Sequence, residues 1–147
     1  MSTEVDSLVE LFSDMSETYR DIDYRPLLED FMPVIAAQES SMFANETDSN
    51  GSSWAPLKPS VVKRKGNDRI LVDTGALISS LVNIGDAGNI HDVFDHGLTF
   101  GTDIEYASLL QDGTKRMPAR PPVGISEETI DGLCEQVADY VVEQLRG

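Results

Sequence analysis

The stretch RILVDTGAL, residues 69–77, places an Asp-Thr-Gly triplet directly after an apolar run. Retroviral-type aspartic proteases present their catalytic carboxylate in this way, so Asp73 is the first candidate for chemistry. A protease of this kind needs two carboxylates that share a proton. Because the chain has a single Asp-Thr-Gly, catalysis would require a homodimer with one Asp73 from each copy.

Two features of the sequence argue against this chemistry. Such folds are nearly all strand, yet the fifty residues upstream have helical patterning. The apolar-apolar-Gly signature expected downstream is also missing, and PPVG, residues 121–124, is the nearest approach to it. Thr74 and Gly75 have a simpler role as a cap and a tight turn ahead of ALISSL. We therefore expect Asp73 to lie in a turn, and a homodimeric aspartic protease stays an alternative.

The stretch HDVFDH, residues 91–96, gathers two histidines and two aspartates, which is a composition that metal sites use. On a strand, successive side chains alternate between faces, so His91 and His96 would point in opposite directions. On a helix, a shared metal would need a spacing of four residues, and these are five apart. We expect solvated residues of a hairpin and no metal ligand.

The single cysteine, Cys134, lies within an apolar stripe and predicts a small core residue rather than a nucleophile. One cysteine also excludes an internal disulfide. No Walker loop, Gly-x-Ser-x-Gly elbow or dinucleotide fingerprint occurs. The sequence thus predicts neither a catalytic residue nor a cofactor.

Charge is spread unevenly over the 147 residues, whose formal net charge is −15. Residues 1–50 carry twelve acidic and two basic side chains, whereas residues 58–69 carry five basic and one acidic. Residues 115–120 add three basic side chains. Stable binding to duplex DNA needs a dominant basic surface, so it is not expected. The two basic islands are instead suited to an acidic neighbour, such as another copy of this chain.

The elements that must position these residues follow from the apolar spacing. Apolar residues from Val5 to Tyr19 predict a first helix over about residues 4–19, and DIDYRP ends it. A second helical stretch runs from Leu27 to Phe43, and Pro33 inside it should kink or split it. The acidic N-terminus shows no signal peptide, and no apolar run approaches the roughly 20 residues that span a bilayer.

From Ile78 the pattern changes to short β-type runs. ISSLVNIGD, NIHDVFD and GLTFGT are separated by turn signals and predict a three-stranded antiparallel meander. DIEYASLLQDG predicts a short helix with Asp103 as its N-cap and Gly113 just past its end. KRMPARPPVG is too rich in proline for regular structure and predicts a stiff, basic, extended arm. Ser126 caps the last helix, which carries an apolar stripe from Ile130 to Leu145.

The fold class is therefore α+β, a small antiparallel sheet of three or more strands packed with N- and C-terminal helices. We expect one domain over residues 1–147. It comprises a helical region 1–44, a long loop 45–69, the sheet with the short helix and arm in 70–125, and the C-terminal helix 126–146. The polar, basic stretch 44–69 is a candidate for ordering only on assembly.

Taken in order, the motifs MFANETDSNGSSWAPLKPSVVKRKG, RILVDTGALISSL and GTDIEYASLLQDGTKRMPARPPVGIS resemble the phage virion-morphogenesis family, the tail-completion proteins typified by phage Mu. The resemblance covers about residues 43–126, and Asp73 falls at a variable position of the family pattern. The matching positions are Phe43, Gly51, Trp54, Pro56, Leu57, Lys65, Ile70, Leu71, Thr74, Gly75, Leu77, Gly101, Thr102, Tyr106, Ala107, Gln111, Gly113, Pro118, Ala119, Arg120 and Pro121.

This resemblance implies a structural protein of the head–tail neck, located in the virion after assembly in the host cytoplasm. The implied assembly is a homo-oligomeric ring, hexameric or dodecameric, between head-closure and tail-terminator proteins. DNA would pass through it without specific binding, and no membrane is involved. A tail terminator or a head-closure protein is the nearest alternative, and an acidic inhibitor that mimics nucleic acid is another.

Two groups of residues are expected to serve this role. Candidate contacts with other subunits are basic, and candidate structural anchors are aromatic residues, glycine and proline. The contact candidates are Lys63, Arg64, Lys65, Arg116 and Arg120, and the anchors are Trp54, Gly75, Tyr106 and Pro118.

Overall fold

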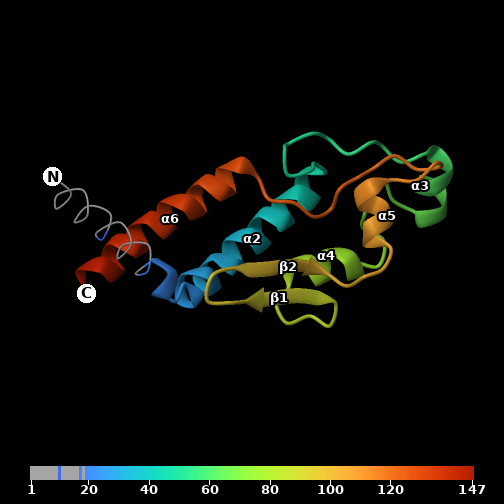
Figure 1. Ribbon diagram of the computed structural model, residues 1–147. Helices are drawn as coiled ribbons and strands as arrows, with labels where there is room; N and C mark the ends of the chain where they lie inside the picture. Colours follow the sequence, from blue (N-terminus) through green and yellow to red (C-terminus); the bar gives the residue numbers. More distant parts are fainter. Residues whose placement is uncertain (1–9, 11–16, 18) are drawn as a thin grey trace.

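The computed structural model describes residues 10, 17 and 19–147 (Figure 1). The predicted first helix over residues 4–19 therefore lies almost wholly outside the described residues. Two strands and several helices build an α+β fold, which confirms the predicted class. The elements are α2 (Arg25–Asn45), α3 (Pro59–Lys65), α4 (Ala76–Val82), β1 (Asn89–Val93), β2 (Leu98–Thr102), α5 (Ala107–Asp112) and α6 (Glu127–Arg146).

Helix α2 is the central element, with α6 along one side and the β1–β2 hairpin on the other (Figure 1). Its buried residues Leu28, Phe31, Ile35 and Met42 recur at helical spacing. The expected split at Pro33 does not occur, since α2 runs unbroken through that residue. Pro33 is exposed, so water can hydrogen-bond the carbonyl group that loses its N–H partner there.

The sheet has two strands, so the prediction of three or more strands is wrong. Strands β1 and β2 pair antiparallel from Asn89 opposite Thr102 to Val93 opposite Leu98. Val93, Leu98 and Phe100 pack against the buried α2 residues Phe31, Met32 and Ile35. The hairpin thus rests its apolar face on the middle of α2.

The stretch ISSLVNIGD, residues 78–86, was expected as the first strand of the meander, but its first five residues belong to helix α4. Its buried residues are Leu77, Ser80 and Leu81, which are spaced three and four apart as on one helical face. The hydroxyl of Ser80 donates to the Leu77 carbonyl over 2.6 Å and lies 2.7 Å from the Thr102 hydroxyl of β2. A short apolar run fits either element, and here the contacts with α2 and the hairpin favour the helix.

Two further boundaries differ from expectation. Helix α5 begins at Ala107 with Tyr106 at its N-cap position, so Asp103 is not the cap. Gly113 does end α5, as predicted. The segment 45–69, expected as a long loop, contains helix α3, which begins at Pro59 and ends at Lys65. Gly66, directly after it, has a φ of 80°. Proline in a first turn and glycine after the last are common helix boundaries.

Helix α6 is capped as predicted, because the Ser126 hydroxyl accepts a hydrogen bond from the Thr129 amide over 3.1 Å. None of its twenty residues is fully buried. Leu133 packs on the α2 cluster, and the Tyr140 hydroxyl donates to the Asp23 carbonyl over 2.8 Å. Cys134 is exposed, so its prediction as a core residue is wrong. The face of α6 that contacts the rest of the chain contains Leu133 and Tyr140, and Cys134 lies to one side of it.

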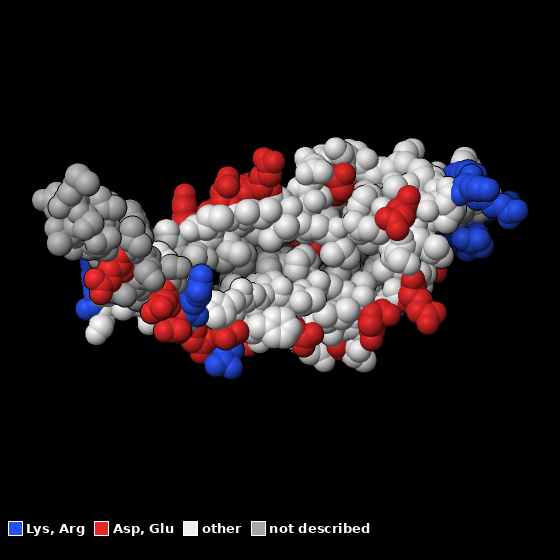
Figure 2. Space-filling model, viewed as in Figure 1, with Lys and Arg blue, Asp and Glu red and all other residues white. Residues whose placement is uncertain are grey.

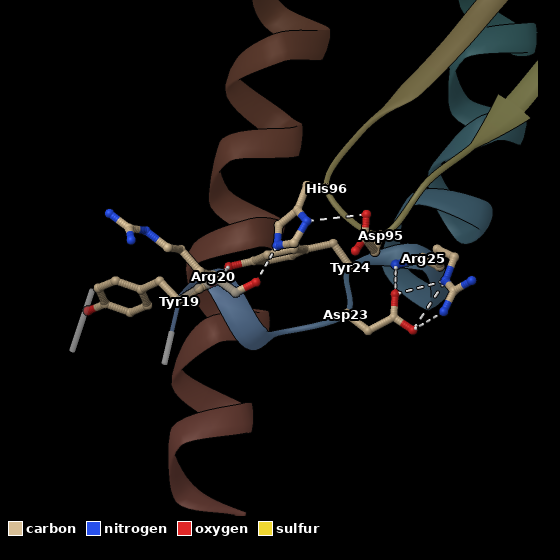
Figure 3. A network of polar contacts seen from close by, with 7 residues as sticks. All are labelled: Tyr19, Arg20, Asp23, Tyr24, Arg25, Asp95 and His96. Atoms are coloured by element: carbon tan, nitrogen blue, oxygen red, sulfur yellow. Dashed lines mark hydrogen bonds and ion pairs between the residues drawn. The ribbon is translucent and has the colours of Figure 1, made fainter. Parts of the chain in front are cut away.

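A polar network fixes the start of α2 to the hairpin turn (Figure 3). The Tyr24 amide donates to the Asp95 carbonyl over 2.8 Å, and the His96 ring lies 2.5 Å from the Arg20 carbonyl. Asp23 accepts hydrogen bonds from the backbone and side chain of Arg25, which lower the pKa of its carboxyl. The turn residues thereby hold the chain where it enters α2.

Candidate assembly interface

Basic side chains gather at one end of the molecule, over α3 (Figure 2). We call this surface the basic tip and define it as Lys58, Lys63, Arg64, Lys65 and Arg116. Helix α3 contains three of these residues and no acidic one. Helix α6, by contrast, contains six acidic residues and one basic residue. The molecule therefore has a basic end and an acidic flank.

A groove of about 300 Å³ opens at this tip, between α3, α5 and the proline-rich arm. Its apolar lining comes from Leu57, Val61, Leu71, Leu110, Met117 and Pro118, and its basic lining from Lys58, Arg64, Arg116 and Arg120. Among the residues that the structure describes, no carboxylate lines it. This basic groove joins the two basic islands of the sequence in one site.

Trp54 holds the chain that leads into the groove. It is 4% exposed and packs edge-on against Phe43, with ring centroids 5.3 Å apart. Its indole Nε1 donates to the Pro121 carbonyl over 3.0 Å. The same side chain therefore contacts the end of α2 and the proline-rich arm.

Arg120 occupies a different place from the one expected. It is 6% exposed, with Nε donating to the Ala55 carbonyl over 2.7 Å and Nη2 to the Pro56 carbonyl over 2.9 Å. These hydrogen bonds give Arg120 a structural role within its own chain, and its predicted contact with another subunit stays a prediction. Arg116 and Pro118 are exposed beside it.

The arm itself is held by backbone and side-chain hydrogen bonds to α5 and α2. The Arg120 amide donates to the Leu110 carbonyl over 2.8 Å. Gln111 Nε2 donates to the Val123 carbonyl over 2.9 Å, and Gln111 Oε1 accepts from the Val123 amide over 3.1 Å. Gln38 does the same for the next residues, donating to the Gly124 carbonyl over 2.7 Å and accepting from the Ser126 amide over 2.8 Å.

A second hollow, of about 470 Å³, lies next to the groove and contains the Asp-Thr-Gly turn. Asp73 is exposed there, the Thr74 hydroxyl accepts from the Ala76 amide over 3.3 Å, and Gly75 has a φ of 86°. The predicted turn is thus confirmed. Tyr106, 48% exposed, lines the same hollow together with Arg64 and Lys65.

The histidines do not meet. His91 Nε2 lies 3.6 Å from Glu29 Oε2, which is too far for a hydrogen bond, whereas His96 sits in the hairpin turn 3.2 Å from Asp95. Over the described part of the chain, no three His, Cys, Asp or Glu side chains gather as metal ligands would. Within the same residues, no helix has the length and apolar composition needed to cross a bilayer.

Sequence reasoning missed Glu39, which is fully buried in α2. Burial raises the pKa of its carboxyl to about 8, against the opposing effect of a hydrogen bond that Oε1 accepts from the Gly124 amide over 3.2 Å. Its Oε2 has no hydrogen-bond partner among the described residues. A signal was present, because Glu39 follows Ile35 by four residues on the buried stripe of α2.

Comparison with known proteins gives one family. A family model described as the phage virion morphogenesis family matches residues 4–143, nearly the whole chain. No curated protein and no solved structure shows a significant match.

Proposed function

The chain belongs to the phage virion morphogenesis family, and from this premise we propose that it is a structural protein of the head–tail neck of a tailed bacteriophage. In this role it acts without catalysis. Copies form a ring that joins the head-closure layer to the tail terminator, so that a finished tail can attach to a filled head.

The observation that supports this proposal is the separation of charge between the basic tip and the acidic flank of one molecule. A basic groove at the tip and an acidic helix at the flank are complementary surfaces, which favours contact between copies over contact with nucleic acid. With a net charge of −15, most of the surface repels phosphate. DNA can then move past the ring without being held.

The test is removal of the coding sequence from the phage, followed by electron microscopy of the lysate. We expect filled heads and finished tails that are separate, and whole particles again when the protein is supplied in trans. Emptied heads would point instead to a head-closure protein, and tails of irregular length to a tail terminator. Normal infectious particles without the protein would overturn the proposal.

A further inference from the structure

We propose that the basic groove binds the outward face of α6 from a second copy of this chain, so that copies join head to tail. This inference deepens the proposed ring, on which it rests, by naming the two surfaces that meet. It is drawn from the shape and charge of the groove and from the unburied side of α6.

The outward side of α6 is apolar along one stripe and acidic along the next. Ile130 is 41% exposed and Leu145 48% exposed, and Cys134 lies between them on the same stripe. At 100° per residue, Glu135 and Asp139 fall on the adjoining stripe. The opposite side of the helix is used by Leu133 and Tyr140 for contacts within the chain.

The groove offers both kinds of chemistry that the outward side of α6 needs. Its apolar lining, including Val61 and Met117, can take the apolar stripe, while Lys58, Arg64 and Arg116 can pair with the acidic one. Arg64 and Arg116 suit carboxylates because a guanidinium group can bind one with two parallel hydrogen bonds. A phosphate backbone would use the basic residues and leave the apolar lining unmatched, so a helix fits this groove better than DNA does.

Contact between the two surfaces must join different molecules. The groove lies at the α3 end, whereas α6 runs to the opposite end of the elongated molecule (Figure 1). Because two different surfaces meet, the growing oligomer keeps one free groove at one end and one free α6 at the other after every addition. Such a contact closes into a ring when the rotation between copies allows it.

Chemical cross-linking tests the contact with the cysteine that the chain already has. Cys134 is the single cysteine and is exposed on α6. We would introduce Lys58→Cys at the groove and treat purified virions, and the concentrated protein, with a short bismaleimide. We expect a ladder of covalent oligomers. Thr99→Cys, exposed on β2, is the matched control and should give no ladder above the wild-type background.

A mixing experiment shows that the link joins two copies. Lys58→Cys in a Cys134→Ser background, mixed with the wild-type chain, should give covalent dimers only. A ladder for Thr99→Cys equal to that for Lys58→Cys, or no ladder for Lys58→Cys in virions that contain the protein, would overturn the inference. Absence of the protein from virions would instead contradict the proposed function, so the two failures are distinguishable.

Charge reversal gives a second, independent measurement. Arg116→Glu and Glu135→Lys should each lower the association constant of concentrated protein about tenfold in sedimentation experiments. The two changes combined should restore much of it. If Arg116→Glu instead abolishes retention of duplex DNA and leaves self-association unchanged, the groove binds nucleic acid and the inference fails.

Discussion

The indole Nε1 of Trp54 donates a hydrogen bond to the carbonyl oxygen of Pro121 over 3.0 Å, joining two segments 67 residues apart. This bond and the edge-on contact with Phe43 hold the chain after α2 against the arm that forms one wall of the groove. The groove therefore depends on a residue that does not line it.

Substitution of Trp54 should separate the contribution of its ring from that of its N–H group. Trp54→Phe keeps a buried ring and leaves the Pro121 carbonyl without its donor, which should cost about 1–3 kcal/mol. Trp54→Ala should cost about 3–5 kcal/mol, because a cavity is added. Urea unfolding followed by circular dichroism measures both. Equal losses for the two variants would contradict this reading.

Two arginines of the arm should behave differently although they lie four residues apart. Arg120→Ala removes two hydrogen bonds to backbone carbonyls and should lower the free energy of unfolding by roughly 2–5 kcal/mol. Arg116→Ala changes an exposed residue and should stay within about 0.5 kcal/mol of the parent. Urea unfolding of the pair is the measurement, and a large loss for Arg116→Ala would contradict the assignment.

Gly113 and Gly66 both follow the last residue of a helix with a positive φ, 75° and 80°. At Gly66 the ψ of 6° is left-handed helical and alanine costs about 1–2 kcal/mol, whereas the ψ of 175° at Gly113 is a conformation that essentially only glycine adopts, which costs alanine about 1–3 kcal/mol. A Cβ at Gly113 would also lie 2.7 Å from the Ala119 amide nitrogen. A Cβ at Gly66 would have no heavy atom of the described residues within 4 Å, its chain neighbours aside. Thermal unfolding should show a clearly larger loss for Gly113→Ala than for Gly66→Ala.

Glu39 should make stability depend on pH. Because burial raises the pKa of the folded-state carboxyl from 4.5 to about 8, the folded protein holds this proton more tightly than the unfolded chain. The free energy of unfolding should fall as pH rises from about 5 to about 8, by roughly 1.4 kcal/mol for each unit of pKa difference. Urea unfolding at several pH values measures this slope.

Glu39→Gln is the control for that slope. It keeps an oxygen that can accept from the Gly124 amide and removes the ionisation. The difference in unfolding free energy between the two proteins should grow with pH over the same range, in favour of the glutamine variant. A constant difference would show that Glu39 is not the group responsible.

Asp73→Asn should leave particle assembly unchanged, since this side chain is exposed in a turn whose shape is fixed by Thr74 and Gly75. Complementation of the deleted phage with the variant measures this directly. Cleavage of peptides by the purified parent, lost in the variant, would revive the protease alternative.

Local chemistry in the sequence predicted several elements well. Ser126 was recognisable as the cap of α6, and the turn signal of His96 and Gly97 separated the two strands. Thr74 and Gly75 marked a turn without any information about their surroundings. In each case the deciding contact lies within a few residues, so the sequence contains it.

Errors arose where distant contacts decide. The run that became α4 fits a strand or a helix, and only packing on α2 and the hairpin distinguishes them. Cys134 is exposed because α6 turns a different face toward α2. Arg120 is buried because its guanidinium group donates hydrogen bonds to the carbonyl groups of residues 55 and 56. Such neighbours, 64 and 65 residues away, leave no periodic signal.

The glutamine pairs around the arm have a consequence for how the chain can vary in length. The side-chain amides of Gln111 and Gln38 each donate one hydrogen bond to the backbone of residues 123–126 and accept one from it. A neighbouring β-strand would pair with this backbone in the same way. An insertion or deletion there would shift one pair out of phase with the other. Natural length variation should therefore accumulate in the exposed turn at residues 83–87. No described side chain both donates to and accepts from the backbone of that turn.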